Sequence, residues 1–87
     1  MGKLEVLIKK FNLAPGTKLV CFEGFYWIYD GKKTLIPVTG GKEASKDHYG
    51  DIYTNDGKLR KGEKPSAWVS AVLWLQKPNP KDIIEVK

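Results

Sequence analysis

Ser45, Asp47 and His48 are the residues whose types could supply a nucleophile, an acid and a base within one short stretch. Acyl-transfer enzymes hold such a trio in a fixed geometry, with the base within hydrogen-bonding distance of the nucleophile. Side chains one to three positions apart in a glycine-rich segment point in different directions, and no G-x-S-x-G motif accompanies them. We therefore expect a solvated loop here and predict that the protein is not an enzyme.

Metal binding requires several His, Cys or carboxylate side chains at a suitable spacing. The chain has one histidine and one cysteine, and it contains no H-x-x-x-H or D-x-D-x-D-G pattern. The carboxylates Glu43, Asp47 and Glu63 each lie beside a lysine, which is typical of a solvated surface of mixed charge. We predict no metal site and no cofactor.

Lysines and a glycine pair point to a phosphate-bearing ligand. The formal net charge is +5, and fourteen of the fifteen basic residues are Lys, Arg60 being the exception. Lysine suits phosphates in general, whereas arginine is the residue that reads guanine edges, so sequence-specific readout in the major groove is disfavoured. Gly40-Gly41-Lys42 adds backbone amides and a cation that together can hold an anion.

An aromatic stretch could provide a stacking surface. Phe25, Trp27 and Tyr29 are alternate residues of one expected strand and would share a face, on which nucleobases could stack. The same side chains could instead fill the core, or anchor a protein partner. The residues predicted to bind the ligand are Phe25, Trp27, Tyr29, Lys32, Lys33 and Lys42.

The elements that must position these residues begin with an amphipathic helix near the N-terminus. Its apolar residues at helical spacing are Leu4, Leu7, Ile8 and Phe11. Residues 18–22 and 25–29 are rich in β-favouring side chains and predict two strands. Cys21 lies between Val20 and Phe22, which predicts a small buried hydrophobe.

Asp30-Gly31 is typical of a two-residue hairpin turn, so residues 32–39 are expected to return as a third strand. This register places Tyr29 opposite Lys32 and Trp27 opposite Thr34.

Residues 40–50 have no hydrophobic period and predict a loop. The Asp56-Gly57 turn predicts a second, weaker hairpin that joins residues 51–54 to residues 58–60.

Residues 66–77 fit two templates. A helix would follow Ser66 as N-cap and align four apolar residues, Trp68, Ala71, Val72 and Leu75. A strand would place Ser70 and Gln76 on one face, and because Trp and Val favour strands we predict a strand. Residues 83–86 predict a closing strand, preceded by Asn79-Pro80 as a turn or as the cap of a short helix.

Together these elements predict a single α+β domain over residues 1–87, with a short N-terminal amphipathic helix packed on a bent, mostly antiparallel sheet of about five strands. A hydrophobic content of 41% with 11% aromatic residues exceeds that of disordered chains. No apolar run reaches the roughly 18 residues of a membrane span, and the first residues lack the apolar core of a signal peptide, so we expect a cytoplasmic protein. The oligomeric state is left open.

Five short segments of the chain are LEVLIKK, TKLVCFEG, DIYTNDGKL, PSAW and KDIIEV. They resemble segments of the phage-encoded Thoeris anti-defence type-two-like family, with Asp82-Ile83 where that family has Asp-Trp. The resemblance implies an oligomeric protein that sequesters a signalling nucleotide, and it assigns no ligand residue.

The residues therefore predict a non-enzymatic module that binds nucleic acid or a nucleotide through lysines and an aromatic strand face. The alternatives are a small phage-type inhibitor or adaptor that binds a protein partner, and the nucleotide-sequestering counter-defence protein that the resemblance implies.

Overall fold

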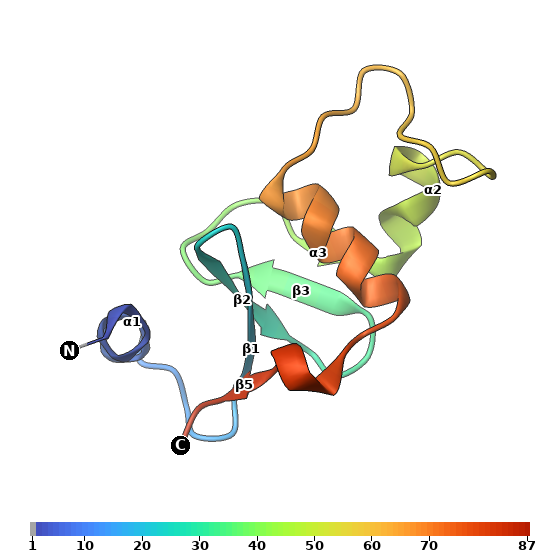
Figure 1. Ribbon diagram of the computed structural model, residues 1–87. Helices are drawn as coiled ribbons and strands as arrows, with labels where there is room; N and C mark the ends of the chain where they lie inside the picture. The colour runs from blue at the N-terminus through green and yellow to red at the C-terminus, as the bar shows by residue number, and fades with distance from the viewer. Residues whose placement is uncertain (1) are drawn as a thin grey trace.

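The computed structural model describes residues 2–87 and has an open, antiparallel sheet in the order β4-β3-β2-β1-β5. Figure 1 shows helices α1 and α3 on opposite sides of the hairpin that β1 and β2 form. The predicted α+β class, with a short N-terminal helix and a five-stranded antiparallel sheet, is confirmed. The elements are α1 (Lys3–Lys10), β1 (Lys18–Phe22), β2 (Phe25–Tyr29), β3 (Thr34–Pro37), β4 (Ala44–Ser45), η1 (Lys46–His48), α2 (Tyr49–Ile52), α3 (Ala67–Gln76), η2 (Pro80–Asp82) and β5 (Ile84–Glu85).

The hydrophobic core lies between the sheet and α3. Alternate strand residues share a face, so Val20 of β1, Trp27 of β2 and Leu35 of β3 all point toward this helix. The helix covers them with an apolar side of its own. The buried core residues are Val20, Trp27, Leu35, Ala44, Ile52, Val69, Ala71, Val72 and Leu75.

The predicted strand over residues 66–77 is wrong, and the helical alternative holds. The hydroxyl of Ser66 accepts a hydrogen bond from the amide of Val69 at 3.2 Å, as an N-cap does. Residues 67–76 are apolar around most of the helix, which is the pattern of a helix buried in a core. Capping and burial outweigh the modest strand preference of Trp and Val.

The turn between β2 and β3 contains residues 30–33 instead of the predicted two residues. Tyr29 pairs with Leu35 and Trp27 pairs with Pro37, so the predicted register is wrong. The carboxylate of Asp30 causes the difference. Its Oδ1 accepts hydrogen bonds from the amides of Lys32, Lys33 and Thr34 at 2.7, 2.9 and 3.0 Å, which stabilises the wider turn.

We expect this turn to make the free energy of unfolding depend on pH in the acidic range. Burial opposes ionisation of Asp30, but hydrogen bonds from the amides of Thr34, Lys32 and Lys33 outweigh it and lower the pKa of the carboxyl below 3.8. The stabilisation is therefore complete above pH 3.8 and is lost as the pH falls through the lowered pKa. Asp30→Ala should cost about 1 kcal/mol at neutral pH.

Urea unfolding at several pH values measures this effect. Asp30→Asn is the matched control, because it keeps the side-chain oxygen and removes the charge. The difference between wild type and Asp30→Ala should shrink in acid, and a difference that stays constant with pH would contradict the role of the carboxylate.

Residues 40–50 are only partly the predicted loop. Strand β4 pairs with β3 through Ser45 and Ala44, and η1 and α2 follow it. The buried Ala44 and Ile52 anchor this segment to the core. The sequence has no hydrophobic periodicity here that would predict their burial. The second predicted hairpin is reduced to one bridge between Tyr53 and Leu59, because α2 takes up residues 49–52.

The remaining terminal elements follow the sequence pattern more closely. The predicted closing strand appears as β5, which pairs with β1. Before it, η2 begins after Asn79, whose side chain accepts a hydrogen bond from the amide of Lys81 at 3.0 Å. The short helix that Asn79 could cap and the closing strand therefore both occur, one after the other. Within residues 2–87, no helix has the length and apolar character that a membrane crossing requires.

Helix α1 covers its side of the sheet incompletely. Leu4, Leu7 and Ile8 are half-buried, and no residue of this helix is fully buried. The ammonium group of Lys3 donates to the carbonyl of Gly24 at 2.9 Å, which holds the helix beside the β1–β2 turn. Cys21 faces this side and is exposed, so its predicted burial is wrong. Its neighbours Val20 and Phe22 take the side of α3.

A truncation in α1 should therefore have a small effect. Full burial of a leucine side chain is worth about 1.5 to 3 kcal/mol, so Leu7→Ala at this half-buried position should cost about 1 kcal/mol. A thermal melt should show a decrease of roughly 4 to 8 °C. Val6→Ala on the exposed side of the helix is the control and should not lower the melting temperature, because Ala has the higher helix propensity. Equal shifts for both variants would contradict the docking of α1 through Leu7.

Candidate functional site

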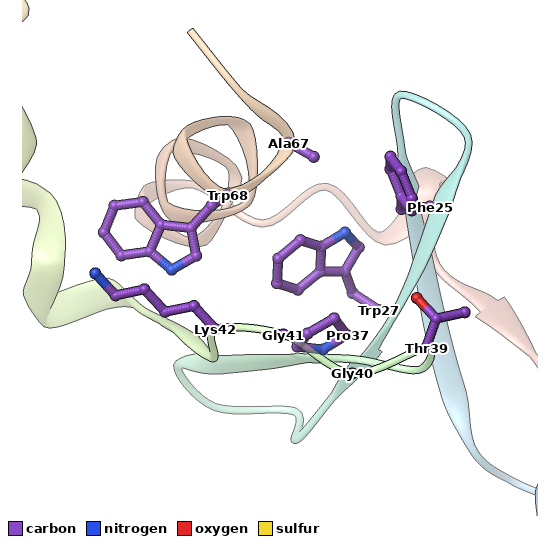
Figure 2. A pocket seen from close by; sticks show the side chains of 9 residues that line it. All are labelled: Phe25, Trp27, Pro37, Thr39, Gly40, Gly41, Lys42, Ala67 and Trp68. Carbon is purple, nitrogen blue, oxygen red and sulfur yellow. The ribbon is translucent and has the colours of Figure 1, made fainter. Parts of the chain in front are cut away.

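A pocket of about 210 Å³ opens between the sheet and the first turn of α3 (Figure 2). The sheet contributes Phe25, Trp27 and Pro37, and α3 contributes Ala67 and Trp68. The connection between β3 and β4 borders the pocket with residues 39–42. The lining is thus mostly aromatic and aliphatic, and Lys42 and Thr39 are its residues with a charged or hydroxyl side chain.

Two glycines bring the backbone close to this pocket. The amide of Gly40 donates to the carbonyl of Pro37 at 3.2 Å, which turns the chain directly after β3. Gly40 and Gly41 have φ angles of +89° and +131°, where residues with a side chain are strained. A Cβ at Gly41 would lie 3.6 Å from Cγ of Pro37, an ordinary van der Waals contact. The glycine pair therefore leaves the pocket rim free of side chains between Thr39 and Lys42.

Trp68 is held in place on one side of the pocket. Its indole Nε1 donates to the carbonyl of Glu43 at 3.0 Å. Nζ of Lys42 lies 4.2 Å from the centre of the indole ring, a cation–π contact. The imidazole of His48 lies 5.4 Å from the same ring, centre to centre. Trp68 is thus an immobilised aromatic wall of the pocket, with the ammonium group of Lys42 beside it.

Trp27 forms the inner wall and belongs to the core as much as to the pocket. Its side chain is only 4% exposed and contacts Phe22 edge to face, with 6.5 Å between ring centres. Its Nε1 is buried and has no hydrogen-bond acceptor among the described residues. Phe25, by contrast, is 54% exposed.

The structure brings together three of the six residues that the sequence predicted to bind a ligand, namely Phe25, Trp27 and Lys42. Tyr29 does not line the pocket. Its ring packs edge to face on Trp74 at 5.1 Å, and its hydroxyl donates to the carbonyl of Lys32 at 3.4 Å. The shared strand face exists, but α3 covers it, so it is not an open platform.

Lys32 and Lys33 lie in the turn after β2, away from the pocket lining. Nζ of Lys33 forms an ion pair with Oδ2 of Asp47 at 2.9 Å. This hydrogen bond raises the pKa of Lys33 and lowers that of Asp47. The pair connects the turn to η1, which gives Lys33 a structural contact.

The sequence-based list omitted Trp68, Pro37, Thr39 and Ala67. Trp68 enters the pocket because residues 67–76 form a helix whose first turn meets the β3–β4 connection. The signal that could have found it is Ser66, since an N-cap there places Trp68 at the exposed end of the helix.

Ser45, Asp47 and His48 are not arranged as a catalytic trio. The hydroxyl of Ser45 accepts a hydrogen bond from the amide of Asp47 at 3.3 Å and so caps η1. Nδ1 of His48 lies 3.4 Å from Oδ2 of Asp51 instead. Within residues 2–87, no hydrogen bond joins Ser45 to His48, and no three His, Cys, Asp or Glu side chains gather as metal ligands would.

Comparison of the chain with protein-family models, with curated proteins and with solved structures finds no match. The resemblance to the Thoeris anti-defence type-two-like family stays a prediction, and the argument for function rests on the pocket.

Proposed function

We propose that this protein is a non-enzymatic module that binds a phosphate-bearing ligand, a nucleotide or single-stranded nucleic acid. One base enters the pocket and packs against Trp68, and the phosphate lies at the rim near Lys42. The observation that carries the proposal is this combination of an aromatic pocket with a cation and a glycine pair at its edge.

The size of the pocket supports one ring system as the occupant. Pockets for drug-sized ligands have volumes of about 300 to 1,000 Å³, and this one has about 210 Å³. Stacking of a base on an aromatic side chain is worth roughly 1 to 3 kcal/mol and tolerates different sequences. The rest of a nucleotide or strand would remain outside, over the rim.

The positive charge of the protein supports a ligand that bears a phosphate. The net charge of +5 attracts polyanions over a distance. Lys42 already lies over Trp68, so a phosphate attached to a base on that ring would be close to the ammonium group.

Salt dependence tests the proposal. Titration of the protein with a fluorescent single-stranded oligonucleotide at several salt concentrations should give a linear fall of log K with log salt. Lys42→Ala should weaken binding at low salt and reduce the slope by about 0.7, the value for one phosphate contact on a single strand. Lys32→Ala is the matched control and should leave the slope unchanged, because Lys32 lies in a turn outside the pocket.

Two outcomes would count against the proposal. Absence of binding to any nucleotide or oligonucleotide at about 50 mM salt would exclude it, because electrostatic attraction is strongest there. If the Lys32 and Lys42 substitutions had equal effects on the salt dependence, the phosphate would not bind specifically at the pocket.

A protein partner is the second candidate, and the side of the sheet under α1 favours it. Ile36 is 47% exposed there, and Val6 and Phe11 of the N-terminal region are exposed as well. An inhibitor or adaptor could use such side chains as anchors. Binding of a protein through them would depend weakly on salt, whereas binding of phosphates would depend on it strongly.

A further inference from the structure

The three tryptophans differ in how their indole N–H groups are satisfied. Trp68 donates to the carbonyl of Glu43 at 3.0 Å, and Trp74 donates to Oδ2 of Asp82 at 2.9 Å. Trp27 is the most buried of the three and its N–H has no acceptor among residues 2–87. Buried donors without an acceptor are rare in folded proteins, because such a group has lost its water without gaining a partner.

Trp27 lines the pocket, but its Nε1 atom is itself covered by neighbouring atoms. Figure 2 shows the nitrogen of Trp27 on the edge of the indole that faces Phe25 and Ala67, and both of these residues line the pocket. Ala67 is fixed in the first turn of α3, and its side chain is a single methyl group. Phe25 is 54% exposed at the start of β2, so its ring has room to rotate toward solvent.

We propose that Trp27 Nε1 donates a hydrogen bond to a carbonyl oxygen of a pyrimidine base, thymine or uracil, that enters the pocket as the Phe25 ring rotates outward. The inference rests on the proposed function and names its preferred base. A pocket of about 210 Å³ favours the smaller, single-ring bases. Thymine and uracil carry a carbonyl acceptor on each side of their ring N–H, so one of these acceptors can meet Trp27 Nε1.

Nitrogen-15 NMR of the indole groups tests this hydrogen bond without any substitution at Trp27. The protein should give three indole N–H signals, one for each tryptophan, and Trp68→Phe and Trp74→Phe assign them. Thymidine monophosphate and a short oligothymidylate are the two probes, one for a free nucleotide and one for a strand. Each probe that binds should move the Trp27 signal downfield, while the Trp74 signal, already paired with Asp82, stays in place.

Affinities supply the second measurement. An oligonucleotide in which difluorotoluene replaces thymine keeps the shape of the base but removes its strong acceptors. It should bind about five- to tenfold more weakly than oligothymidylate, as expected for one lost hydrogen bond. Oligoadenylate should also bind more weakly, because a purine is larger. In Trp27→Phe, which keeps a ring and removes the N–H, the preference for thymine over difluorotoluene should disappear.

The outcomes separate the two proposals. Oligothymidylate binding with an unmoved Trp27 signal, or with equal affinity for the difluorotoluene strand, would overturn the hydrogen bond and leave base binding intact. Equal affinity for oligoadenylate would overturn the pyrimidine preference. No binding of either probe would overturn the proposed function itself. If Trp27→Phe does not fold, the signal shift and the difluorotoluene comparison on the wild-type protein still decide.

Discussion

Replacement of Trp27 by alanine should destabilise the protein by about 3 to 5 kcal/mol, the range for a large aromatic residue removed from a core. Trp27 is only 4% exposed, and it packs among the sheet residues and α3. Small domains have total stabilities of roughly 5 to 15 kcal/mol, so this one change should unfold a measurable fraction of the molecules. Urea unfolding followed by circular dichroism measures the loss.

Phe25→Ala is the matched control, because Phe25 lies on the same strand and the same face of the sheet but is half-exposed. It should cost much less stability than Trp27→Ala. A Trp27→Ala protein with wild-type stability would show that the indole contributes to the pocket alone. In that case the core would have to be supported by Leu35 and the apolar residues of α3.

The strands that carry these residues were predictable from the sequence. β1 and β2 match the predicted residues 18–22 and 25–29, because β-branched and aromatic side chains are dense there and a short turn separates them. Alternation also placed Phe25, Trp27 and Tyr29 on one face. The alternating pattern does not predict whether a helix covers that face. In the structure, α3 covers it.

Residues 66–77 show why that covering helix was not found. A segment with few polar residues in its interior has little periodicity, so both the helix and the strand template fit it. The deciding interaction is local, the bond from the amide of Val69 to the hydroxyl of Ser66. Since Trp68 reaches the pocket only as part of a helix, the same error removed it from the predicted site.

The turn after β2 shows a second limit. Asp-Gly is a common two-residue turn, but the carboxylate of Asp30 can accept several amides at once and then widens the turn. The wider turn shifts the register of β3, so that Pro37 lies beside Trp27. Competition between two turn conformations depends on these few hydrogen bonds, and spacing alone does not reveal which one wins.

The pocket itself could be predicted only in part. Lys42 and the glycine pair were recognised as a possible anion contact, and the aromatic residues as a possible stacking surface. Their meeting depends on the β3–β4 connection, which turns back through the bond from Gly40 to Pro37. Contacts between segments far apart in the chain are a property of packing, so the sequence named three of the residues and missed the tryptophan that faces them.

Substitution of Trp68 by alanine is expected to weaken binding of oligothymidylate by about ten- to a hundredfold, since stacking of one base is worth roughly 1 to 3 kcal/mol. The indole of Trp68 lines the pocket and is half-buried, so its loss should cost less stability than the loss of Trp27. Fluorescence anisotropy of a labelled strand measures the affinity, and a thermal melt measures the fold.

Two variants locate the effect. Trp68→Phe keeps an aromatic face and removes the N–H that Glu43 accepts, so it should retain most of the affinity. Trp74→Phe removes an indole that does not line the pocket and that contacts Phe22 and Tyr29, so this variant should retain all of the affinity. If Trp68→Ala and Trp74→Phe weakened binding equally while both melted like the wild type, the base would not lie on Trp68. If Trp68→Ala bound like the wild type, the pocket would not be the site, and the exposed side of the sheet under α1 would become the surface to test.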